Sequence, residues 1–211
     1  MIRNAISFQD WAGLGMWSRA SLMESGGGVG KIKVFRQRNE SRQSLEMPVR
    51  EYLEWLETHP PGDAVPDLLV DFSLSKGNVL VDSHDKIVSR YYPHLYSSSA
   101  GPSGGGALGL NNMQFMIGPA LAGASVHFHY TTARLMVHGR ARWFLWPPAK
   151  AFYSSRQIYE WYQTDYPSLQ KEERPLECVQ GPGDLIYLPP VWAHGVLYLQ
   201  DTAGMASLFR A

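Results

Sequence analysis

The chain has 211 residues, of which 45% are hydrophobic, and its 19 basic and 19 acidic residues give a formal net charge of zero. A chain of this size and composition can bury one substantial core, while a neutral total charge gives no reason to expect a nucleic acid or an acidic membrane surface as partner. The single cysteine, Cys178, excludes an internal disulfide.

The first half of the chain predicts a front layer of helices and short strands. Apolar residues in Phe8–Met23 recur at three- and four-residue steps, which indicates helical turns, and Lys31–Phe35 alternates as a strand does. Pro48–Glu57 begins with a proline suited to a first helical turn and continues as an amphipathic helix. Leu68–Phe72 is typical of a short strand. Ser97–Gly106 is rich in serine and glycine and therefore predicts a surface loop.

The second half changes to short strands separated by turn signals, a spacing typical of an all-β sandwich or barrel. The eight predicted strands are Met113–Ile117, Val126–His129, Arg134–His138, Arg142–Trp146, Cys178–Gln180, Leu185–Leu188, Val196–Leu199 and Met205–Phe209. A further helix is predicted between strands, over Ser154–Asp165. We therefore expect one domain over residues 1–211, with a helical and strand layer (residues 1–110) in front of an eight-stranded barrel (residues 111–211).

Two histidines in the second of these strands suggest a metal site. In Ser125–Tyr130, β-branched and aromatic residues alternate with His127 and His129, as in a half-buried strand. Side chains at positions i and i+2 of a strand point to the same face, so both imidazoles are expected to face one interior.

A third histidine reaches the same region from a distant strand. Gly181–Asp184 predicts a tight turn, Leu185–Leu188 a buried strand, and Pro189–Pro190 its end, which places His194 at the mouth of the following strand. Two histidines from one strand and one from another can form a facial set of metal ligands. The other interpretation is that these are ordinary core or rim histidines, because a His-x-His pair alone is a weak motif.

Two longer motifs resemble those of Jumonji C (JmjC, cupin-like) oxygenase domains. Gly139–Pro148 (GRARWFLWPP) is similar to a GRKRWFLYPP motif of that family, and the segment Pro182–His194 is similar to its second signature, in the same order. Arg174–Cys178 is similar to the JmjC domain-containing protein 8 subgroup. This resemblance covers nearly the whole chain and implies a double-stranded β-helix, the cupin or jelly-roll barrel of iron(II)- and 2-oxoglutarate-dependent oxygenases, with an N-terminal helical layer and an inserted helix.

Members of that family hold iron(II) on two histidines and one carboxylate. The resemblance places the metal ligands of this chain at His127, His129 and His194, so that His129 stands where most of the family has a carboxylate. No acidic residue lies between Lys86 and Tyr159 to replace it. Three imidazoles still suit iron, zinc, copper or nickel, so we expect Fe(II) or another divalent transition metal here.

The pocket for 2-oxoglutarate departs from the family pattern as well. Ala141 takes the place of the lysine that binds the distal carboxylate, and Arg140 and Arg142 flank it but point to the opposite face of the strand. Trp143 is expected to line the interior. The missing lysine removes a charge-assisted hydrogen bond typically worth about 1.5–3 kcal/mol. Binding of 2-oxoglutarate therefore needs another cation, for which Arg134 is a candidate.

The resemblance implies an oxidoreductase, a 2-oxoglutarate-dependent dioxygenase of the protein hydroxylase class that acts on a protein substrate. The departures at His129 and Ala141 favour an alternative, a catalytically inactive cupin-like module that works by binding partner proteins. A thiol-dioxygenase-like reaction on three-histidine iron, which needs no 2-oxoglutarate, is a third hypothesis. The sequence leaves the choice between enzyme and binding module open.

Location is also left open by the sequence. No apolar run approaches the roughly 20 residues of a membrane span, and the first residues lack the regions of a signal peptide. By this chain alone we expect a soluble, cytoplasmic protein. However, Met1–Ala5 resembles the middle of the family's opening strand, so the lumen of the endoplasmic reticulum is the expectation if a leader precedes it.

Overall fold

The computed structural model describes residues 1–6, 14–25, 31–38, 41–58, 68–71, 79–95 and 109–210. The predicted loop at Ser97–Gly106 lies outside these residues. So do the first part of the predicted helical turns in Phe8–Met23 and the last residue of the strand predicted over Leu68–Phe72. None of the helices in the described residues is both long and apolar enough to cross a bilayer.

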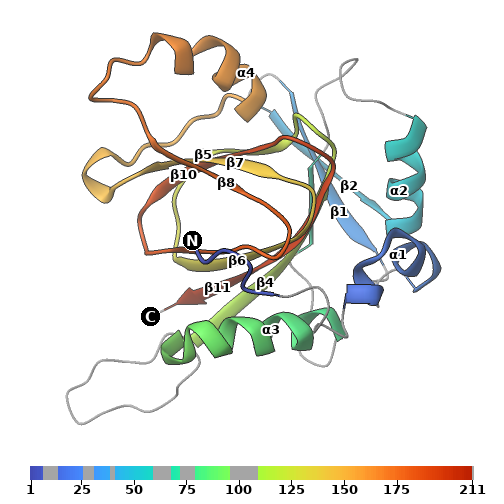
Figure 1. Cartoon of the computed structure of the whole chain (residues 1–211). Coiled ribbons are helices and arrows are strands. Elements are labelled where there is room, and N and C mark those ends of the chain that lie inside the picture. The colour runs from blue at the N-terminus through green and yellow to red at the C-terminus, as the bar shows by residue number, and fades with distance from the viewer. Residues whose placement is uncertain are drawn as a thin grey trace.

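Two antiparallel β-sheets face each other and form a jelly-roll barrel (Figure 1). The larger sheet has the order β2-β1-β3-β4-β11-β6-β9 and the smaller one the order β5-β10-β7-β8. The strands are β1 (Ile32–Arg38), β2 (Ser41–Met47), β3 (Leu68–Asp71), β4 (Gly109–Gly118), β5 (Gly123–His127), β6 (Thr131–His138), β7 (Ala141–Trp146), β8 (Leu176–Gln180), β9 (Leu185–Leu188), β10 (Ala193–Tyr198) and β11 (Thr202–Arg210). This architecture confirms the predicted all-β fold of the double-stranded β-helix type.

Helices cover the outer faces of the sheets. Figure 1 shows α1 and α2 beside β1 and β2, α3 along the large sheet near β4 and β11, and α4 above the small sheet. The helices are η1 (Leu14–Trp17), α1 (Arg19–Ser25), α2 (Val49–Thr58), α3 (Val79–Tyr91), η3 (Pro93–Leu95), η4 (Pro148–Lys150), α4 (Ile158–Thr164) and η5 (Tyr166–Ser168). The helix predicted over Ser154–Asp165 begins later than expected, because the Gln157 side chain caps it by accepting the backbone N–H of Glu160.

Alternation along the strands separates a helix-facing core from the barrel interior. On β6, Leu135 is fully buried in the core that the large sheet shares with Trp17 and Tyr52 of the helical layer. Arg134 and Met136, one position on either side, face the other way, into the space between the sheets. The barrel interior is therefore lined from both sheets, and this is where the histidines lie.

Candidate metal centre

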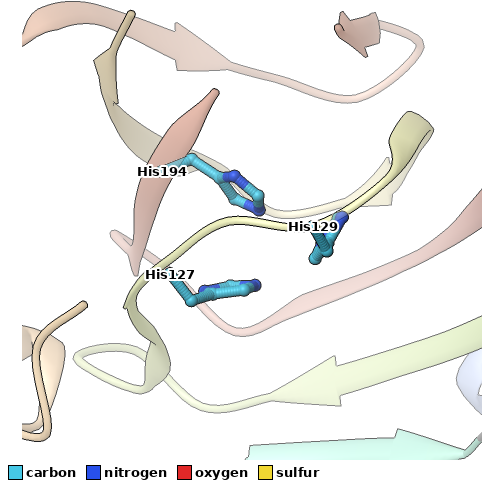
Figure 2. Close-up of side chains that lie close together, drawn as sticks. All are labelled: His127, His129 and His194. Atoms are coloured by element: carbon cyan, nitrogen blue, oxygen red, sulfur yellow. The ribbon is translucent and has the colours of Figure 1, made fainter. Parts of the chain in front are cut away.

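The three predicted metal ligands come together in the wall of the barrel cavity (Figure 2). His127 is the last residue of β5 and His194 the second residue of β10, and the two are direct partners in the antiparallel register. Their ring centroids are 4.3 Å apart, and the ring of His129 lies 5.1 Å from His127 and 4.8 Å from His194. One ligand nitrogen of each residue lies within 4.8 Å of the others.

The predicted strand Val126–His129 was wrong at its C-terminal end, because β5 stops at His127. The carbonyl groups of Phe128 and His129 accept hydrogen bonds from residues outside the sheet. The backbone N–H of Val191 donates to the carbonyl of His129 (3.0 Å), and the Tyr153 hydroxyl donates to the carbonyl of Phe128 (2.9 Å). The loop that carries His129 is therefore tied to the turn before β10, which carries His194.

Val191 adopts a left-handed backbone conformation, with φ of 65°. This region is unfavourable for a β-branched side chain and costs on the order of 1–3 kcal/mol. The strained turn aims the Val191 N–H at the loop of His129 and starts β10 close to His194. Backbone strain at this point thus helps to hold two histidines from different strands together.

Hydrogen bonds fix the tautomer of each imidazole. The Nδ1 atoms of His127, His129 and His194 lie 2.7, 2.8 and 3.0 Å from the backbone carbonyl oxygens of Ser125, Tyr130 and Trp192, respectively. A carbonyl oxygen can only accept, so each Nδ1 carries the proton and each Nε2 keeps its lone pair. In Figure 2 the three rings turn toward a common space. The carbonyl oxygens bonded to Nδ1 thus leave Nε2 as the atom available to a metal.

Burial keeps two of these rings neutral. The pKa of His194 is lowered well below its usual value, first by burial and then by its neighbours His127 and His129. Burial also lowers the pKa of His129, although its bond to the carbonyl of Tyr130 opposes this. A metal ligand must be unprotonated, so the site is ready for a cation at neutral pH.

The donor set fits a divalent transition metal. Nitrogens bound to one ion at about 2.0–2.1 Å lie roughly 3 Å from each other, and the observed spacing of at most 4.8 Å needs only small ring rotations to reach this. No carboxylate lines the cavity among the residues that the structure describes. An ion on these neutral ligands therefore keeps both positive charges, which favours an anionic ligand from solution.

The histidines line a cavity of about 600 Å³ between the two sheets. The large sheet and the small sheet each supply one wall. The wall residues include Gln114, Met116, Thr132, Arg134 and Leu208 from the large sheet and Trp143, Val196 and Tyr198 from the small one. Phe128 and Tyr153 line the same cavity next to the histidines, and Tyr153 is 65% exposed. The cavity is therefore mostly apolar, and Arg134 is the charged residue in its described wall.

Arg134 brings a permanent positive charge into this cavity wall, although the residue is only 3% exposed. Its guanidinium carbon lies 5.2 Å from the centre of the Trp143 ring and 5.4 Å from that of Tyr198, whose hydroxyl accepts a bond from Nη2 (3.3 Å). Its Nε has no hydrogen-bond partner, and no described carboxylate pairs with it. Cation–π contacts of roughly 0.5–2 kcal/mol do not offset the several kcal/mol that burying a charge costs.

The two predicted pocket positions on β7 differ in their surroundings. Trp143 lines the cavity, and its ring centre lies 5.9 Å from that of His194. Ala141 is fully buried in an apolar cluster with Met136 and is absent from the cavity wall. Arg142 points to the outer face, as strand alternation predicts, where its Nε donates to the Glu177 carboxylate (2.7 Å).

Gln180, which the sequence analysis did not single out, organises the wall around Arg134. Its side-chain oxygen accepts the indole N–H of Trp143 (3.1 Å), and its Nε2 donates to the carbonyls of Arg134 and Asp184 (2.9 Å each). Gln180 is fully buried, so these bonds fix the Trp143 ring in a dry environment. The one feature of the sequence that could have pointed to Gln180 is its place at the end of a predicted strand, directly before the turn at Gly181.

Comparisons with known proteins agree with this architecture. Residues 2–209 match the family model described as a cupin-like domain. JmjC domain-containing protein 8 of Mus musculus is 31% identical over 91% of this chain and 67% of its own length. Lysine-specific demethylase JMJ21 of Arabidopsis thaliana is 25% identical over 94% of this chain and 22% of its own length.

A solved structure with a similar fold is YcfD, a ribosomal oxygenase from Escherichia coli, in complex with cobalt and 2-oxoglutarate. It aligns with a TM-score of 0.57 at 14% identity, over 92% of this chain and 44% of that one. The alignment with the JmjC domain-containing protein 8 of Homo sapiens is 37% identical and covers 45% of this chain and 36% of that protein. The match to these proteins therefore covers the barrel and its surroundings, while much of several of them has no counterpart here.

Proposed function

Because this chain belongs to the family of cupin-like, Jumonji C domains, we propose that it is a metal-dependent oxygenase that uses 2-oxoglutarate to hydroxylate a protein side chain. The observation that carries this proposal is the convergence of His127, His129 and His194. In each ring Nδ1 donates a hydrogen bond to a backbone carbonyl, so that Nε2 is free to bind a metal. A large, mostly apolar cavity at the same histidines supplies room for a cosubstrate.

When bound, a redox-active metal such as iron would supply activation of dioxygen. The residues of this chain provide the environment for it. His127 and His194 are partners on paired strands, and the Nδ1 of each ring is bonded to a backbone carbonyl, which is the kind of support that a preorganised site requires. Trp143 and Tyr198, both 2% exposed, form an apolar wall that keeps bulk water away from the reacting groups.

A protein substrate is supported by the residues around the histidines. The ring of Phe128 lies 4.3 Å from that of Tyr153, which is largely exposed, and both line the cavity beside the metal ligands. Tyr130, next in the chain to His129, is 42% exposed. Exposed aromatic residues are enriched in protein-binding surfaces. The names of the similar proteins, a lysine-specific demethylase and a ribosomal oxygenase, agree with such a substrate.

The first prediction concerns metal content. His194→Ala removes a direct ligand, so we expect bound metal affinity to fall by more than the roughly 10- to 100-fold seen when only supporting residues are lost. Elemental analysis of protein purified without an affinity tag measures this. The matched control is His138→Ala, since His138 is exposed at the end of β6 and outside the triad. Equal metal content in the wild type and His194→Ala contradicts the assignment.

The activity itself is tested by conversion of 2-oxoglutarate to succinate in iron-loaded protein, with His194→Ala as the inactive reference. Replacement of the family carboxylate by His129 favours a second function, a metal-bearing module that binds partner proteins without catalysis. Metal binding together with no succinate above the His194→Ala background contradicts the oxygenase proposal and supports this second function.

A further inference from the structure

The geometry points to Arg134 as the anchor for a small dicarboxylate, in place of the cation that the barrel lacks at Ala141. One carboxylate of the ligand binds the guanidinium, and the rest extends along Trp143 toward the histidines. This inference rests on the proposed function for the identity of 2-oxoglutarate as the natural ligand. The anchor residue itself is assigned from the contacts of Arg134.

The first argument is that Arg134 is buried without an anionic partner. It is 3% exposed, its Nε is unbonded, and no carboxylate within the described ranges lies at ion-pair distance. Burying a guanidinium costs folding free energy unless an anionic group pairs with it. Guanidinium groups bind carboxylates through two parallel hydrogen bonds, and the open Nε edge of Arg134 offers one side of such a fork.

The second argument is the position of this charge relative to the metal ligands. Trp143 contacts both ends: its ring lies 5.2 Å from the Arg134 guanidinium carbon and 5.9 Å from the ring centre of His194. A single indole therefore separates the cation from the metal site, a span suited to a short chain with a carboxylate at each end.

The third argument is that the surroundings hold Arg134 in place. Gln180 binds the backbone carbonyl of Arg134 and the indole of Trp143, and the Tyr198 hydroxyl accepts from Nη2. These residues come from three strands of the small sheet, β7, β8 and β10, whereas Arg134 belongs to β6 of the large sheet. The ligand would thus be anchored from the large sheet, opposite the wall that contains Ala141.

The experiment compares binding of glutarate and of 2-oxoglutarate by calorimetry, to metal-free protein and to protein loaded with manganese. Glutarate has both carboxylates but no 2-oxo group, so it reports on the anchor with little help from the metal. We expect Arg134→Met to weaken both ligands roughly 10- to 100-fold, the range for loss of a charged hydrogen bond, and Arg134→Lys to restore part of this. Arg140→Met is the matched control, since Arg140 is exposed on the outer side.

A structural role for Arg134 predicts a different pattern. If Arg134 served mainly to stabilise the barrel, Arg134→Met would lower the melting temperature. As a ligand anchor buried without an ion pair, it should give a melting temperature in Arg134→Met equal to or above that of the ligand-free wild type. Unchanged dicarboxylate affinity in Arg134→Met, or no dicarboxylate binding by the wild type, overturns the inference. Normal binding without succinate formation contradicts the proposed oxygenase and leaves the anchor intact.

Discussion

At the scale of single residues, His129 is the third imidazole of the candidate metal centre, at the position where the resemblance to Jumonji C domains leads us to expect a carboxylate. Its Nδ1 proton is held by the carbonyl of Tyr130, and its ring meets those of His127 and His194. The substitution therefore keeps three donors and removes one negative charge. Neutral nitrogen ligands suit zinc, copper and nickel as well as iron, so the identity of the metal depends strongly on this residue.

His129→Asp is expected to shift metal preference toward iron(II). The carboxylate supplies an anionic oxygen ligand and lowers the net charge of the loaded site, which favours iron(II) over zinc. A change of ~1.4 kcal/mol in the difference between the two binding free energies corresponds to a tenfold change in preference, and we expect roughly that size. Competition titrations under anaerobic conditions measure it. His138→Asp adds the same charge outside the triad and should leave the preference unchanged. An unaltered iron-to-zinc ratio in His129→Asp contradicts this account.

At the scale of elements, α3 is joined to the large sheet by a buried polar contact. The Nδ1 atom of His84 on α3 lies 3.1 Å from the Ser207 hydroxyl on β11, and both residues are fully buried. Burial lowers the pKa of His84 from 6.5 to about 3. His84 shares the inward face of α3 with Val81 and Val88, which explains why apolar periodicity alone did not predict this helix.

The free energy of unfolding should depend on pH through the protonation of His84. Its pKa in the folded state, about 3, lies below the unfolded value of 6.5, so the unfolded chain binds the proton first as pH falls. The stability from neutral His84 is complete above pH 6.5 and declines toward pH 3, by at most ~1.4 kcal/mol per pH unit. Urea unfolding of the wild type and His84→Gln between pH 7 and pH 4 measures this, and the variant should show the smaller slope. Parallel curves contradict the assignment.

At the scale of the whole molecule, strand alternation and turn signals predicted a sandwich or barrel with His127 and His129 on one face, because both features depend on local periodicity. The double-stranded β-helix and the set of three ligands with His194 were expected from the resemblance to Jumonji C domains. Strand β2 was not predicted. Its residues Ser44, Leu45 and Glu46 are all exposed, so this part of the strand lacks the alternation of apolar and polar residues that marks a half-buried strand. The environment of Arg134 could not be predicted either. Its lack of an ionic partner depends on how β6 faces Trp143 and Tyr198 across the interior, and these residues are distant in sequence.

The central claim is that one metal ion binds all three histidines, and X-ray absorption spectroscopy of the zinc-loaded protein tests it most directly. The account predicts a shell with three imidazole nitrogens at about 2.0–2.1 Å, reduced to two in His129→Ala, with any remaining position filled by oxygen. Cys178 is the one cysteine of the chain, and it plays no part in the proposed site. A spectrum with a sulfur ligand, or with fewer than three imidazoles in the wild type, would contradict the three-histidine centre.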